Sequence, residues 1–392
     1  MTRTGVALAS RTRLLPDAVD PLDALGPGGF AWFTDEVGLA TSGVAVRVDA
    51  ADVDDVLAAI DSDDELALPG TGPLAVGALG FDGTAGLVVP SLVVGRLADG
   101  PGWVTEVGPG DFTAEAWPVL PVVGSDARPN RRAWQVAVEE ALDRIAAGRL
   151  DKVVLAREVT VQAERRFEMA GVLRRLRAEN PRSFTYAAGY FVGASPELLV
   201  RRRGSLVVSR PMAGTVARGE SRADDDRLVA AMAASTKEQA EHRLVVGEVR
   251  RGLAAICGDV VAEQPEVVRL PTVAHLATTI RGTLRNRFAS ALGVATLLHP
   301  TPAVGGVPRR AALEAIAELE SFDRGLYAGP VGWVDARGDG DWAVALRGAS
   351  LDGDRARLVA GAGIVAGSGP AAEWAETEAK LEAMRSVLLA PH

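Results

Sequence analysis

Four glutamates fall into two pairs that have the spacing of one helix face. Glu238 and Glu241 are three residues apart in one stretch of helical periodicity, and Glu373 and Glu376 are three apart in another. That spacing places both carboxylates of a pair on the same side of a helix. Two such helices side by side would direct four carboxylates at one point, where oxygen ligands and water suit Mg²⁺. The pattern predicts a site for a hard cation, and the alternative is four solvated carboxylates.

Two of the four glutamates also fit a purely structural role. Ser235 and Glu238 have the spacing of a capping box at the start of a helix. Glu373 falls in the first turn of its helix, where the helix dipole favours an acidic side chain. Glu241 and Glu376 have no such role, so they are the stronger candidates for metal ligands.

Lysine is scarce in this chain. Of the 42 basic residues only three are lysines, namely Lys152, Lys237 and Lys380. A buried amine can lose its proton, whereas a guanidinium stays charged, so each lysine is a candidate for a role that arginine cannot fill. Lys152 opens the segment KVVLARE, in which strand alternation places Lys152, Val154 and Ala156 on one face. On a covered face the amine would lose hydration, which favours its neutral, basic form; a solvated lysine at a strand end is the alternative.

A single carboxylate stands between a turn and an apolar run in FVGASPELLVRRR. This residue, Glu197, is followed directly by Leu198, Leu199 and Val200. A carboxylic acid that donates a proton near neutral pH needs apolar surroundings that raise its pKa, and these neighbours could supply them. The alternative is a glutamate at a strand edge, paired with one of the arginines at 201–203.

Three further polar side chains could contact an anionic substrate. His275 in PTVAHLATT could donate a hydrogen bond or be a satisfied core histidine. Arg347 lies in WAVALRGASLD, which is predicted to be one apolar strand, and an arginine there suits carboxylate recognition. Tyr327 in RGLYAGPVGW could share that role. The glycines of PMAGTVARG and VAGAGIVAG allow close approach of an anionic ligand, or serve turns and bulges.

The composition is that of a globular protein without a nucleic-acid footprint. The chain has 392 residues, 48% of them hydrophobic, and a formal net charge of -9. Phosphate binding needs clustered lysine and arginine, so no nucleic-acid partner is expected. We find no signal-peptide pattern and no membrane-spanning apolar stretch, which predicts a cytoplasmic protein without a membrane partner. The single Cys257 excludes an intramolecular disulfide and is predicted to be a core residue, and no nucleotide motif follows a strand.

Strands that arrive as hairpins alternate with long helices. The predicted helices cover residues 131–147, 167–178, 235–257 and 311–319, with a last one that begins at Pro370 and runs past Met384. Residues 1–125 read as short strands and turns, and 121–130 as a linker. The pattern predicts an α+β fold of large antiparallel sheets packed with flanking helices. We expect an N-terminal part (1–125) and a catalytic region (126–392) within one structural domain.

Ten motifs in order resemble those of the chorismate-utilising enzyme family. They are KVVLARE, FVGASPELL, SRPMAGT, STKEQAEH, AHLATTIRG, LLHPTPAVGG, FDRGLYAGPVGW, ALRGA, AGAGIVAGSGP and EWAETEAK. The resemblance covers about residues 130–385, and the N-terminal third matches only loosely. It implies a Mg²⁺-dependent, reversible conversion of chorismate to isochorismate, in which water attacks C2 as the C4 hydroxyl departs.

The resemblance also implies a role for each candidate residue. Lys152 would be the base that activates water, and Glu197 the acid that protonates the leaving hydroxyl. The metal ligands would be Glu241 and Glu376, with Glu238 and Glu373 bound through water or nearby. The substrate-binding residues would be Tyr327 and Arg347 at the enolpyruvyl carboxylate, Gly214, Thr215, Gly361 and Lys380 around the ring carboxylate and metal, and His275 in the pocket lining.

Three residues help to decide which reaction within the family this chain is expected to catalyse. Family members that use ammonia usually lack a base at the position of Lys152, so water is the expected nucleophile and no amidotransferase subunit is expected. Salicylate synthases, which go on to eliminate pyruvate, typically have threonine where this chain has Ala303. Tyr327 points the other way, because enzymes that stop at isochorismate can have phenylalanine there. An inactive chorismate-binding subunit is a further alternative.

The resemblance also bears on assembly and pathway. Because the family builds its site within one chain, a monomer is expected. Isochorismate serves menaquinone or siderophore biosynthesis, and both pathways remain open.

Overall fold

The structure is a computed structural model, and it describes residues 8–15, 19–108, 130–286 and 289–390. The predicted boundary near residue 125 and the predicted linker lie outside the described residues, except for Asn130. The Asn130 side chain accepts hydrogen bonds from the backbone N–H groups of Arg132 and Ala133 and so caps the helix that follows.

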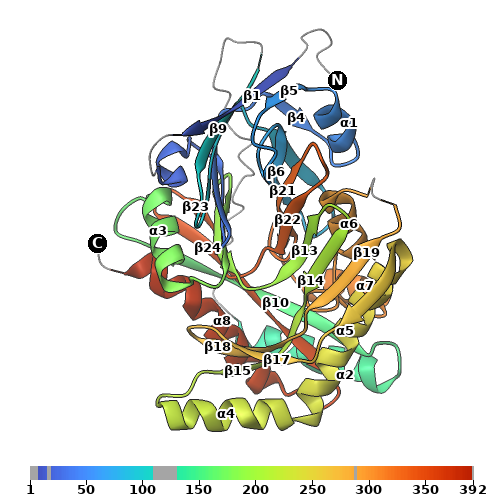
Figure 1. Cartoon of the computed structure of the whole chain (residues 1–392). Coiled ribbons are helices and arrows are strands. Elements are labelled where there is room, and N and C mark those ends of the chain that lie inside the picture. Colours follow the sequence, from blue (N-terminus) through green and yellow to red (C-terminus); the bar gives the residue numbers. More distant parts are fainter. Residues whose placement is uncertain (1–7, 16–18, 109–129, 287–288, 391–392) are drawn as a thin grey trace.

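Two large sheets make up most of the described chain (Figure 1). The first has twelve strands, in the order β20 (Gly306–Val307), β10 (Lys152–Gln162), β24 (Arg355–Val365), β23 (Gly348–Asp352), β12 (Phe191–Ser195), β11 (Phe184–Ala188), β2 (Phe30–Phe33), β3 (Val37–Ser42), β8 (Leu92–Leu97), β9 (Gly102–Gly108), β1 (Ala9–Leu15) and β5 (Asp61–Asp64). The second has nine, in the order β16 (Cys257–Ala262), β19 (Ile280–Leu284), β14 (Leu206–Arg210), β13 (Leu198–Arg203), β22 (Gly340–Val344), β21 (Pro330–Asp335), β6 (Leu74–Leu79), β7 (Ala85–Val89) and β4 (Val46–Val48). A small third sheet contains β15 (Met212–Ala217), β18 (Val273–Ala277) and β17 (Glu266–Arg269).

The two large sheets pack against each other, and helices cover their outer faces. Trp32 and Leu39 of the first sheet share a buried cluster with Val76 and Trp333 of the second. The helices are α1 (Val53–Ala58), α2 (Arg131–Ala146), α3 (Met169–Glu179), α4 (Arg222–Ala234), α5 (Thr236–Ile256), α6 (Ala291–Leu298), α7 (Arg309–Leu319) and α8 (Pro370–Leu389), with a 3-10 helix at Pro21–Ala24. Figure 1 shows α3 and α8 on one side and α5, α6 and α7 on the other. Within the described chain no helix is both long and apolar enough to span a membrane.

This architecture confirms the predicted α+β class. Among the described strands β1 and β5 pair in parallel, and the other pairs are antiparallel. Strands of the N-terminal third are continuous with those of the remainder, because β2 pairs with β11 and β6 with β21. Cys257 is a buried core residue, as predicted.

The predicted helix ends correspond to caps in the structure. Gly148 follows α2 with a φ of 68°, a left-handed conformation that glycine adopts without strain. The Ser235 hydroxyl accepts a hydrogen bond from the Glu238 backbone N–H at 3.3 Å and so caps α5. Pro370 is the first residue of α8. Helices α1, α4 and α6 were not predicted.

The prediction of a single strand for WAVALRGASLD is wrong. The segment forms β22 in the nine-stranded sheet and β23 in the twelve-stranded sheet, with a break at residues 345–347. Arg347 has a φ of 51°, which a strand cannot accommodate and which is uncommon for any residue but glycine. Arg347 therefore lies where the chain crosses from one sheet to the other.

A second crossing runs beside the first. Between β12 and β13 the chain passes from the twelve-stranded to the nine-stranded sheet through Pro196 and Glu197. The Val344 N–H donates to the Glu197 carbonyl at 3.1 Å, and the Ala194 N–H donates to the Arg347 carbonyl at 3.2 Å. The two crossings thus bring Glu197 and Arg347 to the same place between the sheets.

Candidate active site

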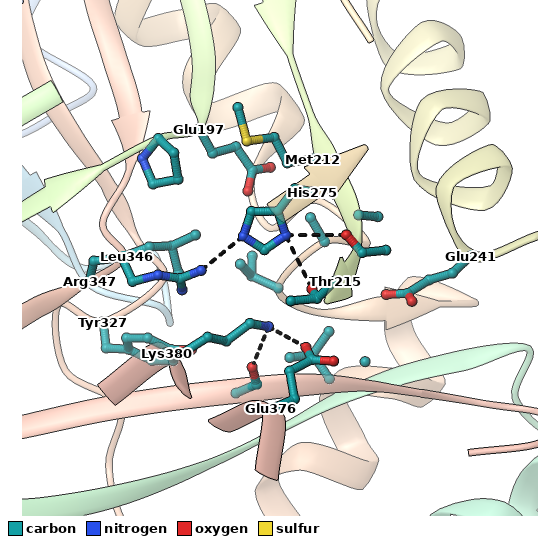
Figure 2. A pocket seen from close by; sticks show the side chains of 18 residues that line it. Glu197, Met212, Thr215, Glu241, His275, Tyr327, Leu346, Arg347, Glu376 and Lys380 are labelled. Carbon is teal, nitrogen blue, oxygen red and sulfur yellow. Dashed lines mark hydrogen bonds and ion pairs between the residues drawn. The ribbon is translucent and has the colours of Figure 1, made fainter. Parts of the chain in front are cut away.

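A pocket opens at these two crossings (Figure 2). Its lining consists of Val154, Pro196, Glu197, Met212, Ala213, Gly214, Thr215, Glu241, His275, Ala303, Val304, Tyr327, Leu346, Arg347, Gly361, Gly363, Glu376 and Lys380. The lining includes every residue that was predicted to bind substrate, together with three predicted catalytic or metal-binding glutamates. The other three predicted residues are not part of the lining, namely Lys152, Glu238 and Glu373.

Glu197 is a buried carboxyl group that forms no ion pair with any residue that the structure describes. Its side chain faces the pocket, and the residue is 3% exposed. Burial raises its pKa to about 7, although the nearby Lys152 ammonium and a backbone hydrogen bond from Met212 favour the ionised form. The group therefore carries a proton much of the time at neutral pH.

The alternative reading of Glu197, a strand-edge glutamate paired with a neighbouring arginine, is wrong. Arg201 and Arg203 pair instead with Asp341, at 2.9 Å and 2.8 Å, and Arg202 pairs with Asp339 at 2.9 Å. These three arginines are engaged along β13, away from the crossing.

Lys152 is buried at the start of β10. It is 1% exposed, which excludes a solvated lysine at a strand end, and its Nζ lies 2.8 Å from Oε1 of Glu241 on α5. Gly363, on the neighbouring strand β24, provides the room for this pair. A Cβ atom at Gly363 would lie 2.4 Å from Oε1 of Glu241 and 3.0 Å from Cε of Lys152.

The substitution Gly363→Ala is therefore expected to separate Lys152 from Glu241. The added methyl group overlaps the carboxylate, so one side chain must move, and the buried charges lose part of their pairing. We expect turnover to fall at least tenfold, with a loss of stability measurable by urea denaturation. Gly369→Ala, just before α8, is a glycine control with open space around its Cβ and an extended backbone that alanine adopts without strain. Equal turnover in both variants would contradict the role given to Gly363.

All three lysines of the chain pair with predicted metal ligands. Lys380 contacts Glu376 at 2.5 Å within α8, and Lys237 of α5 contacts Glu373 of α8 at 2.9 Å. The first turns of α5 and α8 therefore meet, which is the arrangement that the hypothesis of a shared carboxylate site required. Glu238 also has the structural role that its spacing indicated, since its backbone N–H is capped by Ser235 while its carboxylate accepts from the Thr215 N–H at 3.1 Å.

The four carboxylates suit a divalent cation in chemistry and in charge. Among the described residues no three histidine, cysteine or acidic side chains are arranged to hold a metal ion as they stand. Four carboxylates nevertheless face only three ammonium groups. Burial and the neighbouring carboxylates raise the pKa values of Glu238 and Glu373, which indicates an excess of negative charge. A hard cation bound by oxygen ligands would neutralise that excess.

Arg347 and His275 line the pocket on the side away from Glu241 (Figure 2). An Arg347 Nη2–H donates to Nε2 of His275 at 3.0 Å, and Nδ1 of His275 lies 3.2 Å from the Gly214 carbonyl and 3.1 Å from the Thr215 hydroxyl. A guanidinium can only donate, so Nε2 must be the acceptor and Nδ1 carries the proton. Burial and the Arg347 charge lower the pKa of His275 well below its usual value. His275 is therefore neutral, and with both ring nitrogens engaged it is a hydrogen-bonded buried histidine that lines the pocket.

Arg347 is left free to bind an anion. It is half-buried, and within the described chain it has no carboxylate partner. Tyr327 lies near Gly361, where burial raises the Tyr327 pKa to about 12 and keeps the phenol protonated. The Lys380 Nζ donates to the Gly361 carbonyl at 2.9 Å. The pocket thus presents several donors and one uncompensated cation.

The sequence missed mainly the apolar lining. Pro196, Met212, Val304 and Leu346 each border the pocket, yet an isolated apolar side chain carries no chemical signal. All four are direct neighbours of recognised candidates or lie in recognised motifs, which is the signal that could have identified them.

Comparison with known proteins defines the family. Residues 116–389 match the model of the chorismate binding enzyme family, and the chain belongs to this family. A Mycobacterium tuberculosis (strain H37Rv) protein that carries the name MenF is 42% identical over 81% of this chain and 87% of its own length. The isochorismate synthase DhbC of Bacillus subtilis is 37% identical over 82% of each chain. The structure of MenF, the menaquinone-specific isochorismate synthase of Escherichia coli, matches with a TM-score of 0.81 at 28% identity, covering 98% of this chain and 95% of that one.

Proposed function

We propose that the protein is an isochorismate synthase that converts chorismate and isochorismate into each other. Water adds at C2, the ring double bonds shift, and the C4 hydroxyl leaves as water, so atoms balance. The observation that carries this proposal is a buried lysine and a buried, half-protonated glutamate at one site. The names of the relatives support it, since they include a menaquinone-specific and a 2,3-dihydroxybenzoate-specific isochorismate synthase. The product could enter a menaquinone or a siderophore pathway.

The two buried groups divide the work of acid and base. In its neutral form, the Lys152 amine accepts a proton from the attacking water. To reach that form the ammonium must release its own proton, and its ion pair with Glu241 must open. Glu197 donates its proton to the departing hydroxyl. In the reverse direction Glu197 acts as the base and Lys152 as the acid. Because burial raises the pKa of Glu197 to about 7, a large share of this carboxyl group is protonated near pH 7 without help from another residue.

Magnesium is the cofactor that the carboxylates suit. Glu241 and Glu376 would hold it, with Glu238 and Glu373 close by, and the bound ion would supply charge neutralisation for a substrate carboxylate. Lys152, Lys237 and Lys380 must then release or share these carboxylates. Chorismate is a dianion, and Arg347 is placed to bind its other carboxylate.

Replacing Arg347 should weaken substrate binding. For Arg347→Met we expect a KM for chorismate about 10 to 150 times higher, because a hydrogen bond to a charged group contributes roughly 1.5–3 kcal/mol. Steady-state kinetics measures this KM. The control is Arg243→Met, on the exposed face of α5, which should keep the KM of the unmodified enzyme. If both variants keep the KM of the unmodified enzyme, Arg347 does not bind the carboxylate.

A salicylate synthase is the second candidate, and Tyr327 in the pocket lining is the observation that favours it. Ala303, which also lines the pocket, favours isochorismate as the final product. Incubation with chorismate and Mg²⁺ at neutral pH, followed by chromatography of the products, separates the candidates. Isochorismate is the expected product. Salicylate and pyruvate as main products would establish the lyase, and bound but unconverted chorismate would establish an inactive subunit.

We also propose that the enzyme acts as a monomer without an amidotransferase subunit. All the residues assigned above come from one chain. Sedimentation of the purified protein at the concentration of the assay checks the oligomeric state.

A further inference from the structure

A buried ion pair lies directly behind one wall of the pocket. Arg324 and Glu320, whose side chains are 3% and 4% exposed, contact each other at 2.5 Å and 2.8 Å. Neither residue is part of the pocket lining. A buried ion pair is by itself weak support for stability, because desolvation offsets the attraction between its charges. Its hydrogen bonds to the backbone indicate another role.

The pair completes the free edge of β10. On that edge β20 pairs only with Lys152 and Val153, and the Val154 N–H still donates to the Gly305 carbonyl at 2.8 Å. The backbone groups of β10 that follow this N–H have no neighbouring strand on that edge within the described chain. The Val154 carbonyl accepts from Arg324 Nη2 at 2.8 Å, and the Ala156 N–H donates to Glu320 Oε1 at 2.7 Å. Two side chains thus satisfy the backbone groups that a further strand would otherwise satisfy.

Arg324 also holds the loop that forms the neighbouring part of the wall. Its Nη1 donates to the Val304 carbonyl at 2.8 Å. The guanidinium lies 4.2 Å from the centre of the Phe81 ring and 5.9 Å from that of Tyr327. One planar group therefore connects three parts of the pocket wall, which are Val154 on β10, the loop with Ala303 and Val304, and Tyr327.

We propose that Arg324 is a positioning residue, which sets the relative placement of β10, the Ala303–Val304 loop and Tyr327 around the reacting ring. The inference rests on the proposed isochorismate synthase activity. Lysine cannot replace it, since an ammonium group lacks the planar fork that donates in several fixed directions. A wall displaced by about 1 Å costs roughly a hundredfold in rate while ground-state contacts elsewhere persist.

The test compares Arg324→Lys with a matched arginine variant. Arg201→Lys weakens the ion pair with the fully buried Asp341, and neither of these two residues is part of the pocket lining. Arg324→Lys should lower kcat about 10 to 100 times with KM within about threefold. Arg201→Lys should lose stability without that fall in kcat.

Hydrogen exchange gives a measurement that does not depend on turnover. The N–H groups of Val304 and Gly305 bond to the Thr301 carbonyl, so they report on the order of the loop. In Arg324→Lys these N–H groups should exchange at least tenfold faster than in the unmodified protein. In Arg201→Lys their exchange rates should be unchanged. Equal kcat and equal exchange in Arg324→Lys and Arg201→Lys would overturn the positioning role. If the unmodified protein makes no isochorismate, the proposed function fails, and faster loop exchange in Arg324→Lys alone would still support the structural part of the inference.

Discussion

Glu197→Gln is expected to lower kcat by about 10² to 10⁴ times, the range typical of a lost general acid. Glutamine has nearly the same shape and fits the same buried place, but it cannot donate a proton to the C4 hydroxyl. Steady-state kinetics with chorismate measures the loss. A variant that keeps more than a tenth of the turnover would remove Glu197 from the acid role.

The pH dependence gives a second check on Glu197. Because the pKa is raised to about 7 and the protonated form is the acid, kcat/KM for chorismate should fall as pH rises through about 7. The same shift acts on stability. Folding favours the protonated carboxyl, so this stabilisation is present below the unfolded pKa of 4.5 and is lost as pH rises through about 7.

Glu197→Gln should therefore gain stability relative to the unmodified protein as pH rises. The difference in the free energy of unfolding develops between about pH 4.5 and 7 and is on the order of 3 kcal/mol above that window. Urea denaturation at pH 5 and pH 8 measures it. An inactive variant that is also less stable at pH 8 would indicate a structural role instead.

Lys152→Arg is expected to abolish water activation, with kcat lower by about 10² to 10⁴ times. The guanidinium keeps a positive charge beside Glu241, 2.8 Å from the present ammonium, but it cannot accept a proton from water. Loss of turnover in this variant would therefore identify the amine, and not the charge, as the required feature. Calorimetry should show that chorismate still binds.

Lys237→Arg is the matched control for Lys152→Arg. Lys237 also pairs with a glutamate of the site, Glu373, and its side chain is 31% exposed, so a larger group can be accommodated. We expect turnover within about threefold of the unmodified enzyme. Normal turnover in Lys152→Arg, or in Lys152→Ala, would show that Lys152 does not activate water.

Features set by local sequence could be predicted, since they depend on neighbouring residues. Ser235 caps α5, Gly148 follows α2 with a left-handed conformation, and Pro370 begins α8. The three-residue spacing likewise placed the two glutamates of each pair on one helix face. The scarcity of lysine singled out three residues, and each of them contacts a glutamate of the site.

Features set by long-range packing could not be predicted. WAVALRGASLD reads as one strand because nothing in its pattern marks Arg347 as a left-handed residue between two sheets. The partner of each lysine depends on how α5, α8 and β10 meet, which no local pattern encodes. Arg324 stands in the recognised motif FDRGLYAGPVGW, yet its hydrogen bonds to Val154 and Val304 join segments that are 170 and 20 residues away in the chain.

Isotope labelling tests the proposed water addition most directly. Chorismate would be converted in water enriched in oxygen-18, and the isochorismate formed at early times would be analysed by mass spectrometry. The proposed reaction predicts one oxygen-18 in the product, at C2. It also predicts that Glu197→Gln and Lys152→Arg form little of this labelled product. Unlabelled isochorismate would contradict the addition of water, and salicylate with pyruvate in its place would contradict the proposed product.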